Sequence, residues 1–244
     1  MKIITKKFQL GSNPPNRCDV HEHKRVNIRD GVINLLFLAF VLLTILSVAF
    51  SYIYTLSTVY GPSMQPTLNE TGRDNSDTVY INRESEIRHS DIIVIEKETY
   101  YVIKRVIALP GDTVDIIEDE NWDGVNENLR YRVMLNGELL DESSYLNFAL
   151  DTTNLDDHYS SFSAYKTLHI SRVNPDGSIT IGANEIFIMG DNRKNSEDSS
   201  VNGPYDLSKM LGRVEIIIKY NTGVLEHYNQ KIIGMIKAFL VNTF

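Results

Sequence analysis

The apolar stretch INLLFLAFVLLTILSVAFSYIY, residues 33–54, decides how the rest of this sequence is interpreted. As a helix its 22 residues would span about 33 Å, enough to cross the hydrocarbon core of a bilayer. A helix of a soluble domain would show a polar stripe, and this stretch shows none. A cleaved signal peptide would have a shorter apolar region with a small-x-small site soon after it, and no such site follows here. The stretch therefore predicts an uncleaved membrane anchor over residues 31–54. Its polar interruptions are Asn34, Thr44, Ser47 and Ser51.

Charge is distributed unevenly around this anchor. Residues 31–69 contain no Asp, Glu, Lys, Arg or His, a gap of 39 positions. Residues 1–30 hold seven basic and three acidic side chains, a net of +4, whereas the remainder holds 17 basic and 29 acidic ones, a net of −12. The positive-inside tendency predicts a single-pass type II protein of the cell membrane, with a cytoplasmic segment over 1–30 and an extracytoplasmic domain over 55–244.

The same charges indicate which partners to expect. A total of 24 basic against 32 acidic residues, net −8, is untypical of nucleic-acid binding, so we expect no nucleic acid as partner. The anchor predicts a lipid bilayer as partner. Cys18, the only cysteine, falls in the cytoplasmic segment and leaves the outer domain without a disulfide.

The outer domain is predicted to be mainly β, because short β-branched runs alternate with turn residues after Gly61. Asn136-Gly137 between two apolar runs is a strong hairpin signal. The polar segments 118–128 and 141–163 predict loops or short helices. The apolar tail 231–244 is too short for a second crossing and predicts an interfacial or a core-packing helix. The candidate strands are 78–81, 91–95, 100–108, 113–117, 132–140, 178–181, 185–189 and 214–219.

The segment GPSMQPTLN, residues 61–69, carries a candidate nucleophile, Ser63. Gly61 permits backbone conformations closed to other residues, and Pro62 and Pro66 stiffen the loop. A rigid loop of this kind can hold a hydroxyl at a fixed angle beside backbone N–H groups, as a serine nucleophile with an oxyanion hole requires. The alternative interpretation is a plain proline-rich linker that leaves the membrane.

Lys104 is the candidate base, because the six histidines are scattered and no Gly-x-Ser-x-Gly elbow is present. In the predicted strand YYVIKRVIA, Lys104 shares a face with Val102, Val106 and Ala108, while Arg105 faces the other way with Ile103 and Ile107. An inward-packed face would desolvate the ammonium and lower its pKa, which suits a general base. The alternative is a lysine that snorkels to solvent at an edge strand.

A third cluster, MGDNRKNSEDSSVNGPYDL, follows a predicted strand at residues 189–207. It holds Asp191, Asp198 and three serines, one of which could hydrogen-bond the lysine amine. A polar surface loop with Asx turns is the alternative. Calcium-loop spacing and accompanying His or Cys ligands are both missing, so we expect no metal and no other cofactor.

Taken in order, the three segments resemble the motifs of the bacterial type I signal peptidases, membrane-anchored endopeptidases with a Ser-Lys dyad. The serine motif resembles GPSMQPTL, with Ser63 as nucleophile, and the lysine motif resembles YVIKRVIALPGD, with Lys104 as general base. The last motif resembles GDNRKNSEDSS, where Ser196 would orient the lysine amine. The supporting motif residues are Gly61, Met64, Pro66, Arg105, Gly111, Asp112, Gly190, Asp191, Asn192 and Asp198.

The resemblance covers about residues 33–219 and implies an exported antiparallel β-sheet domain of the signal-peptidase type. It also implies that the substrates are signal peptides of exported preproteins, with small side chains one and three residues before the cut. The chain departs from the family at three positions. Where it has Ser200 the family often has an arginine, where it has Ser90 the family often has a glycine, and where it has Gly61 some members have a serine.

Two other functions are compatible with parts of this pattern. A self-cleaving Ser-Lys regulator would be cytoplasmic and carry a DNA-binding domain, which the anchor and the acidity argue against. A non-catalytic or specialised signal-peptidase-like assembly factor would not need both Ser63 and Lys104.

Overall fold

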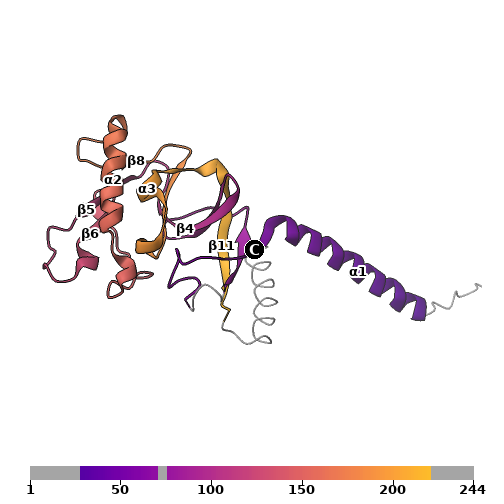
Figure 1. The fold of residues 1–244 in the computed structure, drawn as a ribbon. Coiled ribbons are helices and arrows are strands. Elements are labelled where there is room, and N and C mark those ends of the chain that lie inside the picture. Colours follow the sequence, from indigo (N-terminus) through magenta and orange to yellow (C-terminus); the bar gives the residue numbers. More distant parts are fainter. Residues whose placement is uncertain (1–27, 71–75, 221–244) are drawn as a thin grey trace, which may run out of the picture. The chain divides into compact units, whose positions relative to one another are not determined.

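The computed structural model describes residues 28–70 and 76–220 (Figure 1). The chain divides into two units, one ending at Leu46 and one beginning at Ser47. The predictions for the cytoplasmic segment with Cys18, and for the tail at residues 231–244, lie outside the described residues.

The predicted apolar helix is present as α1 (Ile28–Ile53), which begins three residues before the predicted residue 31. Its stretch Arg29–Ile53 is long and apolar enough to cross a membrane, with a mean hydropathy of 2.7 over an 18-residue window. The hydroxyls of Thr44 and Ser51 donate to carbonyls of their own helix, each at 2.8 Å. Polar interruptions satisfied in this way are tolerated where no water is present.

A seven-stranded sheet forms the larger part of the second unit (Figure 1). All of its neighbouring strands pair antiparallel, in the order β1-β2-β11-β3-β4-β9-β10. Its strands are β1 (Tyr54–Thr58), β2 (Thr78–Asn82), β3 (Ile92–Lys97), β4 (Tyr100–Ala108), β9 (Glu185–Met189), β10 (Tyr205–Asp206) and β11 (Met210–Ile218).

A second, four-stranded antiparallel sheet is inserted between β4 and β9, in the order β7-β6-β5-β8. We call residues 113–181 the inserted lobe. It comprises β5 (Thr113–Glu118), β6 (Tyr131–Leu135), β7 (Glu138–Leu139), α2 (Asp156–Leu168) and β8 (Ile179–Thr180). In Figure 1, α2 lies beside this sheet. The remaining helices are α3 (Ser199–Asn202) and 3-10 turns at Glu127–Leu129, Asp151–Thr153, Ile170–Arg172, Arg193–Asn195 and Leu207–Lys209.

Three clusters of buried apolar side chains hold the second unit together. One joins the inserted lobe to the large sheet, because Phe162 of α2 packs against Phe187 of β9 with ring centroids 5.5 Å apart. A second lies beneath the serine segment and includes Met64 and Leu68. The third lies between β3, β4 and β9.

The structure confirms a mainly antiparallel β domain, and each predicted strand is present. Asn136 and Gly137 form the predicted hairpin turn, with φ of 54° and 83°. The prediction allowed short helices within residues 141–163 but did not place α2 or its end at Leu168, because only His158 and Phe162 of its 13 residues are buried and no apolar period marks it. It also missed the two-residue β10, and it began β11 at residue 214 instead of Met210. Strand β1 begins at Tyr54, the last residue of the predicted anchor.

Candidate active site

The two residues singled out for chemistry lie in contact. Lys104 Nζ donates to Ser63 Oγ at 2.8 Å and to the carbonyl of Ile103 at 3.0 Å. Lys104 stands in the centre of β4 opposite Ile93, and only 5% of the residue is exposed. Burial lowers the pKa of Lys104, and the carboxylates of Asp198 and Asp191 act in the opposite direction without outweighing it.

Strand alternation explains why this lysine is buried. Val102 and Val106, predicted to share its face, both belong to the apolar cluster between β3, β4 and β9. Ile103 packs instead against the cluster beneath the serine segment. Ala108 departs from the prediction, because the register shifts between Val106 and Ala108 and places Ala108 in the cluster of the inserted lobe.

The segment that carries Ser63 is fixed at both of its ends. Gly61 has a φ of +90°, a conformation that side chains disfavour, and Met64 is buried beneath the loop. Asn69 closes the segment: its amide donates to the carbonyls of Val59 at 3.0 Å and Gly61 at 3.1 Å. Asn69 is 2% exposed and was not predicted as a site residue.

Gly190 and Asn192 bring the third motif against the nucleophile. A Cβ on Gly190 would overlap both the carbonyl of Ser63 and the hydroxyl of Ser196, so this position requires glycine for close approach. The backbone N–H of Asn192 donates to the carbonyl of Ser63 at 3.0 Å. The motif residues predicted as support thus fix the Ser63 main chain.

Ser196 and Asp198 lie in this cluster, but their hydrogen bonds differ from the prediction. The hydroxyl of Ser196 donates to Asp198 Oδ2 at 2.5 Å, and among the described contacts it makes no hydrogen bond to Lys104. Asp198 is fully buried, caps α3 and also accepts the N–H of Gly190 at 2.9 Å. The predicted orienting role of Ser196 stays a prediction.

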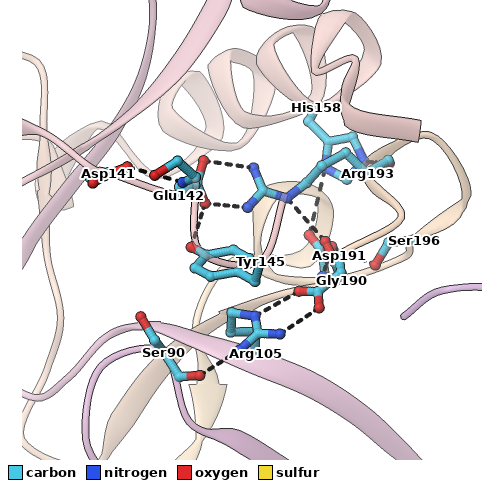
Figure 2. Close-up of polar contacts among 12 residues, drawn as sticks. Ser90, Arg105, Asp141, Glu142, Tyr145, His158, Gly190, Asp191, Arg193 and Ser196 are labelled. Carbon is cyan, nitrogen blue, oxygen red and sulfur yellow. Dashed lines mark hydrogen bonds and ion pairs between the residues drawn. The ribbon is translucent and has the colours of Figure 1, made fainter. Parts of the chain in front are cut away.

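Arg105 and Asp191 form a buried ion pair (Figure 2). Arg105 donates to the carboxylate through Nε at 2.8 Å and Nη2 at 2.6 Å, and through Nη1 to the carbonyl of Ser90 at 2.7 Å. Thr67, close to Pro66 in the serine segment, donates to the same carboxylate at 2.5 Å. The pair therefore ties β4, the serine segment and the third motif together.

Gly111 and Asp112 lie in the turn between β4 and β5. The Asp112 carboxylate accepts the N–H of Leu109 at 2.7 Å and the amide of Asn136 at 2.8 Å. Partial burial opposes the shift, but these hydrogen bonds and His89 lower the pKa of Asp112. Both residues thus serve the junction between the two sheets.

The inserted lobe contributes three side chains that sequence reasoning missed. Glu142 forms an ion pair with Arg193, and the two side chains are each 1% exposed (Figure 2). Tyr145 donates to Glu142 at 2.8 Å, and its ring lies 4.1 Å from the Arg105 guanidinium. Arg193 in turn donates to the carbonyl of Gly190 at 3.0 Å. No periodicity marks residues 141–147, so no local signal could have found these contacts.

His158 of α2 is the third such side chain. It is 3% exposed, and its ring contacts the hydroxyl of Ser200 and the carbonyl of Arg193. Ser200, the position that departs from the resembled family, is fully buried and donates to Asp198 at 2.7 Å.

A groove approaches the serine–lysine pair. It has a volume of about 430 Å³ and is lined by residues 57–60 at the end of β1 and residues 100–103 at the start of β4. Val79 and Val94 complete its lining. Ile103 precedes Lys104 and Tyr60 lies three residues before Ser63, so both walls of the groove lead to the pair.

A serine hydroxyl in contact with a buried lysine amine has the geometry that a Ser-Lys variant of the serine hydrolase site would require. The family model described as "Signal peptidase, peptidase S26" matches residues 32–219. The chain belongs to this signal peptidase family, and its enzyme class is that of a serine endopeptidase.

Two Bacillus relatives agree with this assignment. The chain is 28% identical to signal peptidase I P of Bacillus subtilis subsp. natto over 207 residues, 82% of this chain and 93% of the relative. It is 30% identical to signal peptidase I S of Bacillus subtilis over 155 residues, 61% of this chain and 67% of the relative. A crystal structure of a signal peptidase I from Enterococcus faecalis aligns with a TM-score of 0.33 and 22% identity, covering 54% of this chain and 98% of that one.

Proposed function

We propose that this chain is a membrane-bound signal peptidase I that removes N-terminal signal peptides from exported preproteins, with Ser63 as nucleophile and Lys104 as general base. The observation that carries the proposal is the 2.8 Å contact between Ser63 Oγ and a lysine amine that is almost completely buried.

The reaction is an acyl transfer. Neutral Lys104 takes the proton of Ser63, and the serine oxygen attacks the scissile carbonyl to form a tetrahedral intermediate. The protonated lysine then gives its proton to the leaving amine, and water hydrolyses the acyl-enzyme with the same amine as base. Because burial lowers the pKa of Lys104, the neutral amine is available nearer to neutral pH than a solvated lysine would allow.

Backbone donors are the candidates for the oxyanion hole. Among the described residues, the hydrogen bonds found use the carbonyl of Ser63 but leave its N–H without an acceptor. Gly61 carries no hydroxyl that could donate, so the hole rests on main-chain groups, which the contacts of Asn69 and Asn192 hold in place.

The groove beside the pair is the proposed site of the residues before the cut. An extended peptide paired with a strand edge points alternate side chains to the same side. Strand β1, whose last residues line the groove, lies at the edge of the seven-stranded sheet. Val79 and Val94 are among the apolar residues that line the groove, and we expect it to accept small side chains one and three residues before the scissile bond.

The anchor explains the substrate class. We propose that α1 spans the cell membrane, with residues 1–30 in the cytoplasm and 55–244 outside, as the charge asymmetry favours. Ser63 follows Tyr54 by nine residues, so it stays within about 30 Å of the membrane even when the connection is fully extended. The apolar core of a signal peptide ends at such a height above the membrane.

Protease added to intact cells tests the orientation. It should digest residues 55–244, and protection of this domain would contradict the orientation.

Cleavage of a preprotein in detergent or liposomes tests the proposed chemistry. We expect wild type to release the signal peptide, whereas Ser63→Ala and Lys104→Ala should each lose activity by at least about a thousandfold. His169→Gln, an exposed residue at the end of α2, is a suitable control for expression and folding. Full activity in either site variant would rule out the dyad, and an inactive wild type would favour a non-catalytic assembly factor.

A further inference from the structure

His158 is a buried titratable side chain that the acyl-transfer steps do not use. It lies on the first turn of α2, next to Arg193 in Figure 2. Its Nδ1 contacts the hydroxyl of Ser200 and lies 3.6 Å from Asp198 Oδ1, and its Nε2 contacts the carbonyl of Arg193. Asp198 is 0% exposed, so this histidine meets a carboxylate away from water.

Counting protons along these contacts defines the state of the ring. A carbonyl can only accept, so the contact with Arg193 requires a proton on Nε2. The hydroxyl of Ser200 has one proton, and at 2.7 Å from Asp198 Oδ1 it donates to that oxygen. Ser200 must then accept at its contact with Nδ1, so Nδ1 also carries a proton. A ring with both nitrogens protonated is an imidazolium.

The carboxylate of Asp198 has the donors that an ionised group needs. Oδ2 accepts from the N–H of Gly190 and the hydroxyl of Ser196, while Oδ1 accepts from the N–H and the hydroxyl of Ser200. Four donated hydrogen bonds favour the anion over the protonated acid. The competing arrangement, a neutral histidine with a protonated Asp198, would forfeit part of this stabilisation.

We propose that His158 is the buried cation that compensates the charge of Asp198 through Ser200, and that it thereby acts as a positioning residue for the lysine base. This inference rests on the proposed function of Lys104. Asp198 is the strongest of the neighbouring carboxylates that favour the charged form of Lys104. A cation beside Asp198 offsets this influence and favours the neutral amine.

The other charges around His158 are accounted for. Arg193, whose carbonyl meets the ring, has its guanidinium paired with Glu142. On its own helix, the positive end of the helix dipole disfavours a cation, and the first-turn residues Asp156 and Asp157 oppose that effect. Asp198 is therefore the anion closest to the ring among the contacts of the described residues.

Nuclear magnetic resonance reads the protonation state directly. Full-length protein in detergent is labelled with ¹⁵N-histidine, and the signal of His158 is assigned by its disappearance in His158→Gln. We expect both ring nitrogens to be protonated at neutral pH. A non-protonated ring nitrogen would overturn the proposal. This measurement needs no catalysis, so it separates failure of this inference from failure of the proposed function.

The pH profile of preprotein cleavage tests the consequence. His158→Gln keeps a donor for the Arg193 carbonyl but removes the charge, so Asp198 favours protonated Lys104 more strongly. The acidic limb of the pH profile of kcat/KM should shift to higher pH by about one unit, and activity should recover at high pH. His169→Gln should leave the limb unchanged. A loss that is equal at every pH, or an unmoved limb, would reduce His158 to a packing residue and overturn the proposal.

Rescue of the pH profile by a second cation tests the charge role independently. His158→Ala opens a space beside Ser200, and adding Ser200→Arg places a permanent cation there. The limb should shift in the single variant and return toward the wild-type position in the double variant. A double variant that folds, as judged by an unchanged unfolding midpoint, and yet does not restore the limb would contradict the charge role.

Discussion

The large sheet and the inserted lobe contribute to the active site in different ways. The large sheet and its connections supply the proposed reacting groups, Lys104 from β4 and Ser63 from the segment after β1. The inserted lobe supplies Glu142, Tyr145 and His158, which all contact buried charged side chains or the main chain beside them. In the proposed mechanism, the large sheet thus carries the chemistry, and the inserted lobe compensates the buried charges.

The difference shows why a site with few reacting atoms needs so many residues. Segment 190–200 has to pass close to Ser63, and in doing so it buries Asp191, Arg193 and Asp198 completely. A buried charge without a partner is costly, so each one is paired with a residue that is distant in the sequence. Variants of the two parts should therefore fail in different ways: those of the lobe in stability or in the pH profile, and those of the large sheet in catalysis itself.

Removal of Glu142 should have the largest effect on stability. Glu142→Ala leaves Arg193 buried without a partner, and we expect the free energy of unfolding to fall by about 3–5 kcal/mol. Urea unfolding of the full-length protein in detergent measures this change. Lys194→Ala is the matched control, because its ion pair with Asp151 starts from the same 3-10 turn but is 53% and 70% exposed. The control should cost less than about 1 kcal/mol. Equal effects would show that the lobe stabilises the segment in some other way.

The pH dependence of catalysis should originate at Lys104, the proposed base, which lies in β4 of the large sheet. Burial lowers the pKa of Lys104, so the neutral base predominates above that pKa and is lost as the pH falls through it. Below the pKa, kcat/KM should fall about tenfold per pH unit, about a hundredfold over two units. Preprotein cleavage across the pH range measures this, with unfolding followed in parallel to exclude acid denaturation. A profile that stays flat well below neutrality would count against a lysine base.

The same division separates what the sequence predicts from what it does not. The strands of the large sheet follow from period-two patterns, and Lys104 and Ser63 stand in motifs with a chemical rationale. The contacts of Glu142, Tyr145 and His158 depend on how the lobe packs against segment 190–200, and no local pattern records that packing. The pairing of Asp198 with His158 instead of a cation at residue 200 belongs to this second group.

Ser196 illustrates the limit within a single motif. Its position was predictable, and the structure does bring it beside Gly190 and Asp198. Its hydrogen-bond partner was not predictable, because a hydroxyl has several acceptors within reach and the backbone geometry of a short loop selects among them.

Substitutions of Asn69 test the wall of the groove and leave both proposed reacting groups in place. Its φ of 56° is accessible to glycine, so Asn69→Gly removes the amide while the backbone can keep its conformation. The amide donates to Val59 and Gly61 and accepts the N–H of Asp77 at 2.8 Å, so the loss of these three hydrogen bonds should loosen the groove wall and lower kcat/KM about tenfold, mainly through KM. Steady-state kinetics measures this split. Asn69→Ala adds backbone strain and should unfold more readily than Asn69→Gly. A fall in kcat alone would place the effect on the nucleophile instead of on the groove.

The smallest expected effect has a sign that distinguishes charge from packing. Lys97 at the end of β3 pairs with Glu197 at 3.1 Å, and the two act on the pKa of Lys104 in opposite directions, Glu197 raising it and Lys97 lowering it. Glu197→Gln should therefore move the acidic limb of kcat/KM to lower pH, and Lys97→Ala should move it to higher pH. Because the pair is exposed to solvent, each shift should be only about a few tenths of a pH unit and should shrink as salt is added. Shifts of the same sign would mean that both variants act by disturbing segment 190–200. Opposite, salt-sensitive shifts would show that Lys104 responds to the charges around it even when the side chains that position it are intact.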